Sequence, residues 1–284
     1  MVHFDVYPIN EHITGFLGRF HERMYLVRGT ERSALIDTGC GFGSLKAEVD
    51  KVNGDKPLIV LLTHGHQDHA MGAVEFDEVY LNPEEEEVYT RQTDRDYRLW
   101  GLKISRDAVN VTPDDLLPPA PFSHFRPLRE GDVFDLGGIT LEAFSCPGHT
   151  RGNLVILDRE DRMLFSGDAV SRASFLLGRE STSVEEFRDG LIRLKGLLEG
   201  RVDRILEGHG NGELPFAIFD AVIQVCDEVL EGKTDRIPYD LRGYVGFTAK
   251  ARKPHSLDRV DGGYGNLIYR EDKLWRCQTV TSDQ

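Results

Sequence analysis

The chain has 284 residues, of which 40% are hydrophobic, so it is long enough to bury a substantial core. Its formal net charge of −14 argues against a nucleic-acid backbone as the main partner, because such binding relies on Lys and Arg that neutralise phosphates. No basic segment followed by an apolar stretch opens the chain, and no apolar run approaches the roughly 18 to 20 residues of a membrane span. We therefore expect a cytoplasmic protein without a membrane partner. The four cysteines, which form no CxxC pair, fit reduced thiols and are Cys40, Cys146, Cys226 and Cys277.

The first part of the chain predicts strands followed by one helix. Residues 7–37 read as strand, turn and strand, with a hairpin turn at Gly29 and Thr30. Residues 44–52 predict a helix that Ser44 caps at its N-terminus. Asp37 stands where the segment A-L-I-D-T-G passes from a strand into a glycine-rich loop. Its carboxylate either caps amides of that loop or supports a metal ligand from behind.

The next segment combines an apolar strand with a dense group of metal-ligand side chains. Residues 58–63 predict a strand buried on both faces, and H-G-H-Q-D-H follows at 64–69. A single loop histidine is usually a solvated side chain, but four ligand types within six residues favour a metal site: His64, His66, Asp68 and His69. Imidazole and carboxylate ligands suit zinc, with iron or manganese as alternatives, and the spacing is compatible with two adjacent metals.

The middle of the chain is less regular. Residues 70–74 predict the start of a helix and residues 78–81 a strand. Pro83 opens E-E-E-E-V-Y, whose four glutamates we interpret as a solvated helix face. Between residues 89 and 127 the periodicity weakens and prolines accumulate, so we expect an irregular insertion, either a lid over a site or a packing excursion. His124, within this insertion, is expected to be a surface or core residue and no ligand.

Three later strands also end in potential ligands. The predicted strand at 139–145 runs into C-P-G-H-T with His149, the strand at 163–165 leads into S-G-D with Asp168, and the strand at 202–206 ends in E-G-H-G with His209. Two helices are predicted near these strands, one over 183–198 and an amphipathic one over 215–230. Strand-like runs in the tail at 244–275, such as N-L-I-Y-R, are expected to return to an edge of the sheet.

Together these motifs resemble the metallo-β-lactamase fold superfamily of hydrolases. The segments L-I-D-T-G, H-x-H-x-D-H, G-H-T, S-G-D and G-H-G follow the family order over roughly residues 10–210. The resemblance implies an α/β fold, a four-layer αββα sandwich with two mixed β-sheets and the metals at one end between them. We expect a single domain over residues 1–284, with an insertion at about 89–127 and a C-terminal extension at about 211–284.

Carried over by motif position, the resemblance implies two divalent metal ions, zinc in preference to iron or manganese. One ion would be bound by His64, His66 and His149, the other by Asp68, His69 and His209, and Asp168 would bridge them. This set is similar to that of glyoxalase II and related hydrolases. Two cations that share a water lower its pKa to about 7 or below and so supply a hydroxide nucleophile. Asp68 could orient that water as the catalytic residue.

The leading functional hypothesis is a dinuclear metal-dependent hydrolase that uses a metal-bridging hydroxide to cleave an ester, thioester or lactone of a small molecule. The alternative is a redox enzyme on the same fold, such as a mononuclear iron persulfide dioxygenase. Three arginines that follow ligand loops could contact an anionic substrate group, although surface pairing with acidic residues is the simpler interpretation: Arg151, Arg172 and Arg179. Tyr264 and His255 are candidates to line the pocket.

Overall fold

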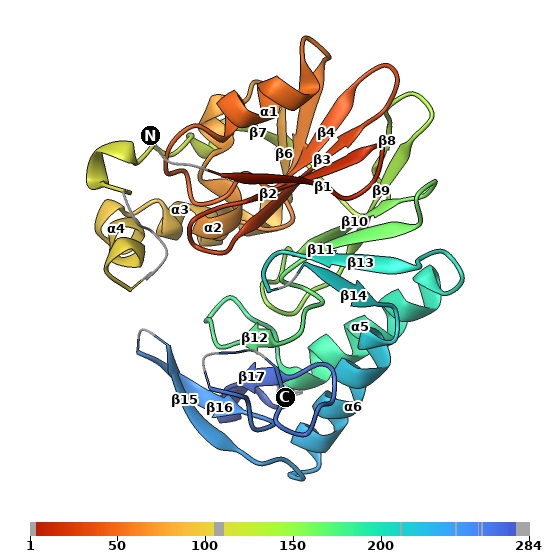
Figure 1. Ribbon diagram of the computed structural model, residues 1–284. Helices are drawn as coiled ribbons and strands as arrows, with labels where there is room; N and C mark the ends of the chain where they lie inside the picture. Colours follow the sequence, from red (N-terminus) through yellow and green to blue (C-terminus); the bar gives the residue numbers. More distant parts are fainter. Residues whose placement is uncertain are drawn as a thin grey trace, which may run out of the picture.

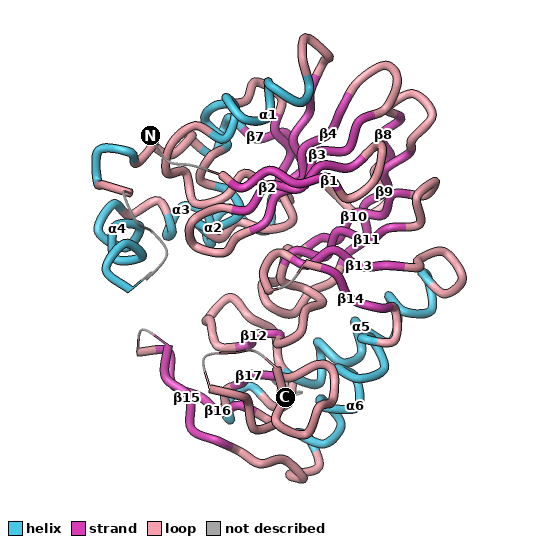
Figure 2. The backbone as a smooth tube through the Cα atoms, in the orientation of Figure 1, coloured by secondary structure: helices cyan, strands magenta, loops and turns pink. Residues whose placement is uncertain are grey.

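The computed structural model describes residues 4–104, 111–210, 212–241, 243–254, 256 and 258–276. Within these ranges two large β-sheets face each other and helices cover their outer sides, as Figures 1 and 2 show. A third, smaller sheet lies beside this sandwich near the C-terminal end of the chain.

The first sheet has seven strands that follow the order of the sequence. They are β1 (Asp5–Pro8), β2 (Ile13–Leu17), β3 (Arg23–Arg28), β4 (Ser33–Ile36), β5 (Leu58–Leu61), β6 (Val79–Leu81) and β7 (Phe125–Pro127). Neighbours are antiparallel from β1 to β4 and parallel from β4 to β7, so the sheet is mixed. The predicted hairpin turn is confirmed: the amide of Gly29 donates to the carbonyl of Arg32 at 3.0 Å.

The second sheet has six strands in the order β14-β13-β11-β10-β9-β8. They are β8 (Val133–Asp135), β9 (Thr140–Ser145), β10 (Leu154–Asp158), β11 (Met163–Gly167), β13 (Arg204–Glu207) and β14 (Glu213–Pro215). Only β11 and β13 pair in parallel, and the helix between them in sequence makes that crossover possible.

Six α-helices and five short 3₁₀ helices lie in the described ranges. The α-helices are α1 (Leu45–Asn53), α2 (Gln67–Ala70), α3 (Glu86–Gln92), α4 (Arg95–Ile104), α5 (Val184–Leu198) and α6 (Ile218–Leu230). The 3₁₀ helices are η1 (Ala73–Glu75), η2 (Pro83–Glu85), η3 (Pro113–Asp115), η4 (Phe122–His124) and η5 (Glu271–Lys273). The predicted N-caps are confirmed, since Ser44 Oγ accepts from the amide of Ala47 and Ser183 Oγ from that of Glu186, each at 3.1 Å. Such caps satisfy amides that the first helical turn leaves unpaired.

Three apolar clusters hold the four layers together. On β3, Val27 packs between the two sheets while its neighbour Leu26 packs against the helices outside the first sheet. Because successive strand residues point to opposite faces, a sheet covered on both sides must be apolar at every position, and both of these residues are fully buried. A further cluster joins the second sheet to α5 and α6 through residues such as Leu157 and Phe187. The predicted αββα sandwich is therefore confirmed.

The third sheet was not predicted. It contains β12 (Ser174–Leu176), β15 (Ile237–Leu241), β16 (Tyr244–Thr248) and β17 (Leu267–Tyr269) in the order β12-β17-β16-β15. The expectation that the tail returns to an edge of a large sheet was wrong, because β17 instead pairs in parallel with β12, a three-residue strand in the loop after β11. The single-domain organisation of the chain stays a prediction.

The insertion at 89–127 is more regular than expected over its first part. Residues 95–104 form α4, and Leu99 and Leu102 of this helix pack near Phe42 and Cys40. His124 is no ligand, since its Nε2 lies 2.8 Å from the carbonyl oxygen of Phe76.

The described cysteines agree with the prediction of reduced thiols. Cys40, Cys146 and Cys226 are free and buried, whereas Cys277 lies outside the described residues. Burial raises the pKa of the Cys146 thiol to about 12, so this residue is an inert packing group.

No helix in the described part of the chain is both long and apolar enough to cross a bilayer.

Candidate metal centre

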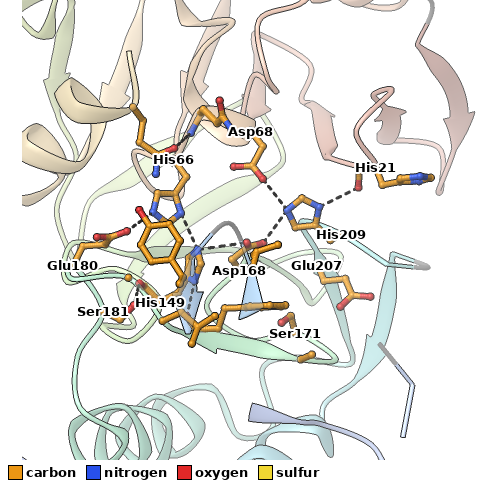
Figure 3. Close-up of a pocket in the computed structure, with 18 of the residues that line it drawn as sticks. His21, His66, Asp68, His149, Asp168, Ser171, Glu180, Ser181, Glu207 and His209 are labelled. Atoms are coloured by element: carbon orange, nitrogen blue, oxygen red, sulfur yellow. Dashed lines mark hydrogen bonds and ion pairs between the residues drawn. The ribbon is translucent and has the colours of Figure 1, made fainter. Parts of the chain in front are cut away.

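The potential ligands all follow strands of the two large sheets. His64 and His66 lie in the loop after β5, and Asp68 and His69 lie on α2, which begins inside the motif and earlier than predicted. His149 follows β9, Asp168 follows β11 and His209 follows β13. The structure brings all seven side chains together at one end of the sandwich, and Figure 3 shows five of them around one pocket.

Three histidines form a first cluster. The Nδ1 atom of His66 lies 3.1 Å from Nε2 of His64 and 2.8 Å from Nε2 of His149. Nitrogens that bind a tetrahedral zinc at about 2.0–2.1 Å are themselves roughly 3.3 Å apart. The three inward ring nitrogens therefore fit one metal ion with little movement.

A second cluster lies beside the first one. Nε2 of His209 is 3.4 Å from Oδ2 of Asp68 and 3.5 Å from Oδ1 of Asp168, and the same Asp168 oxygen is 3.5 Å from Nε2 of His69. The other oxygen of Asp168 faces the first cluster, 3.5 Å from Nε2 of His149. Asp168 thus stands between the two clusters with one oxygen toward each.

Gly208 keeps the second cluster open. A Cβ atom at this position would lie 2.7 Å from Cε1 of His69 and 2.8 Å from Oδ1 of Asp168. Contacts this short do not occur for real Cβ atoms, so a side chain here would displace a candidate ligand. The glycine of E-G-H-G therefore lets the last histidine approach its neighbours.

Two buried atoms of the second cluster have no hydrogen-bond partner among the described residues. These are Nε2 of His69 and Oδ1 of Asp168, which point toward each other. A buried polar atom without a partner costs free energy, and native structures contain few of them. A cation between these atoms would satisfy both, so the residues present fit a metal ion.

The outward nitrogen of each histidine in the two clusters faces a protein acceptor. The pairs are His64 Nδ1 with Thr63 Oγ1 (3.1 Å), His66 Nε2 with Glu180 Oε1 (3.1 Å), His69 Nδ1 with Asp37 Oδ2 (2.8 Å), His149 Nδ1 with the Phe175 carbonyl (2.8 Å) and His209 Nδ1 with the His21 carbonyl (3.1 Å). A neutral imidazole that donates its outward N–H has a free lone pair on its inward nitrogen, which can bind a metal. The outward hydrogen bond also fixes the orientation of the ring. All five rings are therefore oriented as metal ligands are.

Asp37 supports a candidate ligand, one of the two roles left open by its sequence. Its Oδ2 accepts from Nδ1 of His69, and its Oδ1 accepts from the amide of Thr63 at 2.7 Å. The backbone φ of Asp37 is +62°, a left-handed value that few non-glycine residues adopt. The surrounding structure stabilises this conformation at the point where the carboxylate must reach His69.

The two clusters differ in electrostatic character. Burial, together with the adjacent His66, lowers the pKa of His149 to about 4, and burial lowers the pKa of His64 as well, so these two imidazoles of the first cluster are neutral. Burial also lowers the pKa of His69 and His209, but the Asp168 carboxylate outweighs it, with Asp37 helping at His69 and Asp68 at His209. Their pKa values are raised to about 9 and about 10. The second cluster therefore attracts positive charge, which a divalent cation would supply.

The clusters form one side of a cavity of about 410 Å³. His66, Asp68, His149, Asp168 and His209 line it together with residues from β12, α4 and the β15–β16 hairpin. Potential ligands of both clusters are thus accessible to a small molecule.

Comparison with known proteins assigns the family. The family model described as metallo-beta-lactamase superfamily matches residues 17–237. The chain belongs to this superfamily. It is 32% identical over 225 residues to the acyl-coenzyme A thioesterase MBLAC2 of Gallus gallus, covering 72% of this chain and 79% of that protein. It is 25% identical over 203 residues to the hydroxyacylglutathione hydrolase GloC of Haemophilus influenzae, covering 68% of this chain and 87% of that protein.

A solved structure shows the same fold. A metallo-beta-lactamase from Pontibacter korlensis matches with a TM-score of 0.55 at 17% identity, and the match covers 79% of this chain and 99% of that one. The predicted metallo-beta-lactamase superfamily membership and fold are therefore confirmed, as is the expectation of an enzyme of a metal-dependent hydrolase class.

One residue that holds this metallo-beta-lactamase site together was misjudged from the sequence. The run of four glutamates was expected to be a solvated face, but Glu85 is fully buried. Its two carboxylate oxygens accept from the amides of Gly65 and Gly152, each at 2.8 Å. Gly65 lies between His64 and His66, and Gly152 lies three residues after His149, so one side chain joins two ligand loops. Nothing in a run of identical residues distinguishes the member that turns inward.

The predicted anion contacts are not supported. Arg151 pairs with Glu186 at 3.4 Å, Arg172 with Glu207 at 3.0 Å, and Arg179 with Glu87. None of these three arginines lines the 410 Å³ cavity, so the simpler interpretation, pairing with acidic residues, holds. Tyr264 lines a separate cavity of about 130 Å³, and His255 lies outside the described residues.

Another carboxylate beside the site carried no sequence signal. Glu180 lies in the loop after β12 and belongs to none of the sequence motifs, yet its Oε1 lies 3.1 Å from Nε2 of His66. Its other oxygen accepts from Arg91 of α3 at 2.6 Å. Burial raises the pKa of Glu180, but the hydrogen bond with His66, helped by Arg91, outweighs it and holds the pKa well below its usual range, so the carboxylate stays ionised.

Proposed function

We propose that the chain is a dinuclear metal-dependent hydrolase that cleaves a thioester of a small molecule. The observation that carries the proposal is the position of Asp168, whose two oxygens face two separate clusters and whose buried Oδ1 has no partner among the described residues. The relatives named above support the substrate class, because a thioesterase and a hydroxyacylglutathione hydrolase both cleave an acyl–sulfur bond.

The proposed ligands are those implied by the motifs. His64, His66 and His149 would hold the first metal, Asp68, His69 and His209 the second, and Asp168 would bridge them. The chemistry that a bound cation pair supplies is polarisation of the acyl carbonyl and a water whose pKa falls to about 7. Zinc suits this donor set best, with iron and manganese as alternatives.

The residues of the chain provide orientation and a proton acceptor. The Asp68 carboxylate lines the cavity beside His209, where it can accept a hydrogen bond from the attacking water and take up its proton. No side-chain nucleophile is required. Ser181 lines the cavity, but its hydroxyl donates to the carbonyl of His149 at 2.8 Å and so has no base to activate it.

The dinuclear proposal is favoured over the mononuclear iron alternative. A persulfide dioxygenase with one iron would leave Asp68 and His209 without a role. Nε2 of His209 lies 3.4 Å from Oδ2 of Asp68 and 3.5 Å from Oδ1 of Asp168, so these side chains surround the place proposed for a second cation.

Metal content and hydrolysis test the proposal together. We expect purified protein to contain about two equivalents of zinc, iron or manganese, and a chelator to remove both the metal and the hydrolysis of an acyl thioester, which added zinc restores. A His66→Ala variant should lose metal and activity. Protein without stoichiometric metal, or a His66→Ala variant as active as the wild type, would contradict the proposal. Oxygen consumption with a persulfide substrate would instead support the iron alternative.

Replacing Asp37 with asparagine should weaken metal binding without unfolding the protein. Asparagine tolerates the left-handed backbone that position 37 adopts, and the substitution removes the negative charge behind His69 and replaces one of the two accepting oxygens with an NH₂ group. Loss of such a supporting carboxylate lowers metal affinity by about 10- to 100-fold. Competition with a chromogenic chelator would measure the change, and an unchanged affinity would show that Asp37 serves only the loop.

A further inference from the structure

We propose that the cavity beside the candidate metal centre binds an uncharged, apolar acyl chain, and that Leu241 and Tyr244 of the β15–β16 hairpin select for it. This inference rests on the proposed thioesterase function and adds the substrate class of the same site. The family match ends at residue 237, so both selecting residues lie beyond it.

Part of the cavity wall is apolar and comes from the third sheet and its flanks. Its side chains are Ala173, Phe175 and Leu177 from β12 and its flanks, with Leu241 and Tyr244 from the hairpin. Phe175 also contacts Tyr239 of β15 with ring centroids 6.0 Å apart, so the two edge strands of the third sheet meet beside this wall. An apolar surface of this kind favours a hydrocarbon group.

The apolar wall begins at the reactive end of the cavity. The carbonyl of Phe175 accepts from Nδ1 of His149 at 2.8 Å, and the side chain of the same residue lines the cavity. An acyl carbonyl held beside His149 and Asp168 would therefore lie next to this wall. Because the wall is apolar, it accommodates the alkyl chain of the acyl group better than a polar leaving thiol.

The lining of the cavity disfavours a carboxylate at the far end of the acyl chain. None of the described residues that line it is Lys or Arg, and the two lining glutamates, Glu180 and Glu207, are already paired with Arg91 and Arg172. A terminal carboxylate on the acyl chain would therefore lose its hydration without gaining a Lys or Arg partner. Neutral alkyl chains do not meet this cost.

A second cavity provides room for a longer chain. It has a volume of about 430 Å³, is lined by Asp96, Trp100 and Gly243, and shares Tyr97 and Tyr244 with the first cavity. The shared tyrosines mark the place where the space beside the ligands continues between α4 and the β15–β16 hairpin. Figure 1 shows these two elements facing each other.

The hairpin offers a matched pair of positions for a test. Leu241 and Tyr244 are partners across the two strands, and Asp240 and Val245 form the next pair. Because adjacent strand residues point to opposite faces, Val245 turns away from the cavity, and it is 65% exposed. A charge placed at 241 or at 245 therefore changes the same hairpin on opposite faces.

The experiment compares acyl chains in four proteins: wild type, Leu241→Asp, Tyr244→Ala and the control Val245→Asp. Zinc-loaded protein is assayed with saturated acyl thioesters from four to sixteen carbons and with dicarboxylic acyl thioesters of matching length. Each methylene that the wall buries should raise kcat/KM of the wild type about fourfold until the cavity is filled. Leu241→Asp should lose at least about tenfold toward long chains and little toward the shortest. Tyr244→Ala should shift the preferred length, and Val245→Asp should match the wild type.

A binding measurement separates this inference from the proposed function. Alkyl thioethers, which cannot be hydrolysed, are titrated calorimetrically into the same four proteins. Equal affinity for all chain lengths, or equal effects of Leu241→Asp and Val245→Asp, would overturn the inference even if thioesters are hydrolysed. Length-dependent thioether binding without any thioesterase activity would support the acyl site and overturn the proposed function alone.

Discussion

An Asp168→Ala variant is expected to hydrolyse thioesters at least about a hundredfold more slowly than the wild type. Asp168 is the only described side chain with one oxygen toward each of the two clusters, so its loss removes a ligand from both proposed metals at once. Metal content should fall from a pair of ions to a single ion or less. Elemental analysis and the rate of thioester hydrolysis, measured on the same preparation, check both expectations.

The control for this variant is Asp203→Asn. Asp203 is an exposed carboxylate that pairs with Arg162 at 2.8 Å on the surface, so its neutralisation should change neither metal content nor rate. An Asp168→Asn variant, which keeps one oxygen but loses the charge, should lie between the alanine variant and the wild type. Full metal retention by Asp168→Ala would show that this residue does not bridge two ions.

A Glu85→Ala variant should lose stability and metal affinity together. It leaves the buried amides of Gly65 and Gly152 without their acceptor, and each such amide costs about 1–3 kcal/mol. We expect the free energy of unfolding of the metal-free protein to fall by roughly 2–6 kcal/mol, the sum for the two amides. The loops that carry His64, His66 and His149 would also lose their common anchor, so metal should dissociate faster.

Glu86→Ala is the matched control, since Glu86 is the next residue in the same run and is exposed. Chemical denaturation and chelator competition should show the wild-type values for this variant. If Glu85→Ala unfolds at the same denaturant concentration as Glu86→Ala, the two loops are held together by other contacts.

The sandwich was predictable because its strands are covered on both faces. Runs such as L-I-V-L at 58–61 leave no polar face, and only a sheet between two layers accommodates them. The convergence of the potential ligands was predictable for a related reason. His64, His149 and His209 each follow a strand, and loops that leave strand ends at one side of a sandwich are neighbours in space. Their role as metal ligands stays a proposal.

The features that escaped prediction depend on contacts between distant segments. Glu85 is buried because two separate loops present backbone amides to its carboxylate. One of these amides belongs to Gly152, which is 67 positions away in the sequence. β12 has three residues and no amphipathic pattern of its own, and it becomes a strand because β17 supplies a hydrogen-bonding edge. Neither partner can be read from the local sequence.

The position of β12 has a consequence for how such an enzyme can acquire new substrates. One residue of this strand, Phe175, contacts His149 through its backbone carbonyl and lines the cavity with its side chain, so a substitution there would change the proposed acyl-binding wall directly beside a candidate ligand. Leu241 and Tyr244 of the hairpin line the cavity, and neither of them belongs to the groups of candidate ligands. Divergence in evolution, or redesign in the laboratory, can therefore proceed through residues 237–248 while the inherited chemistry is preserved.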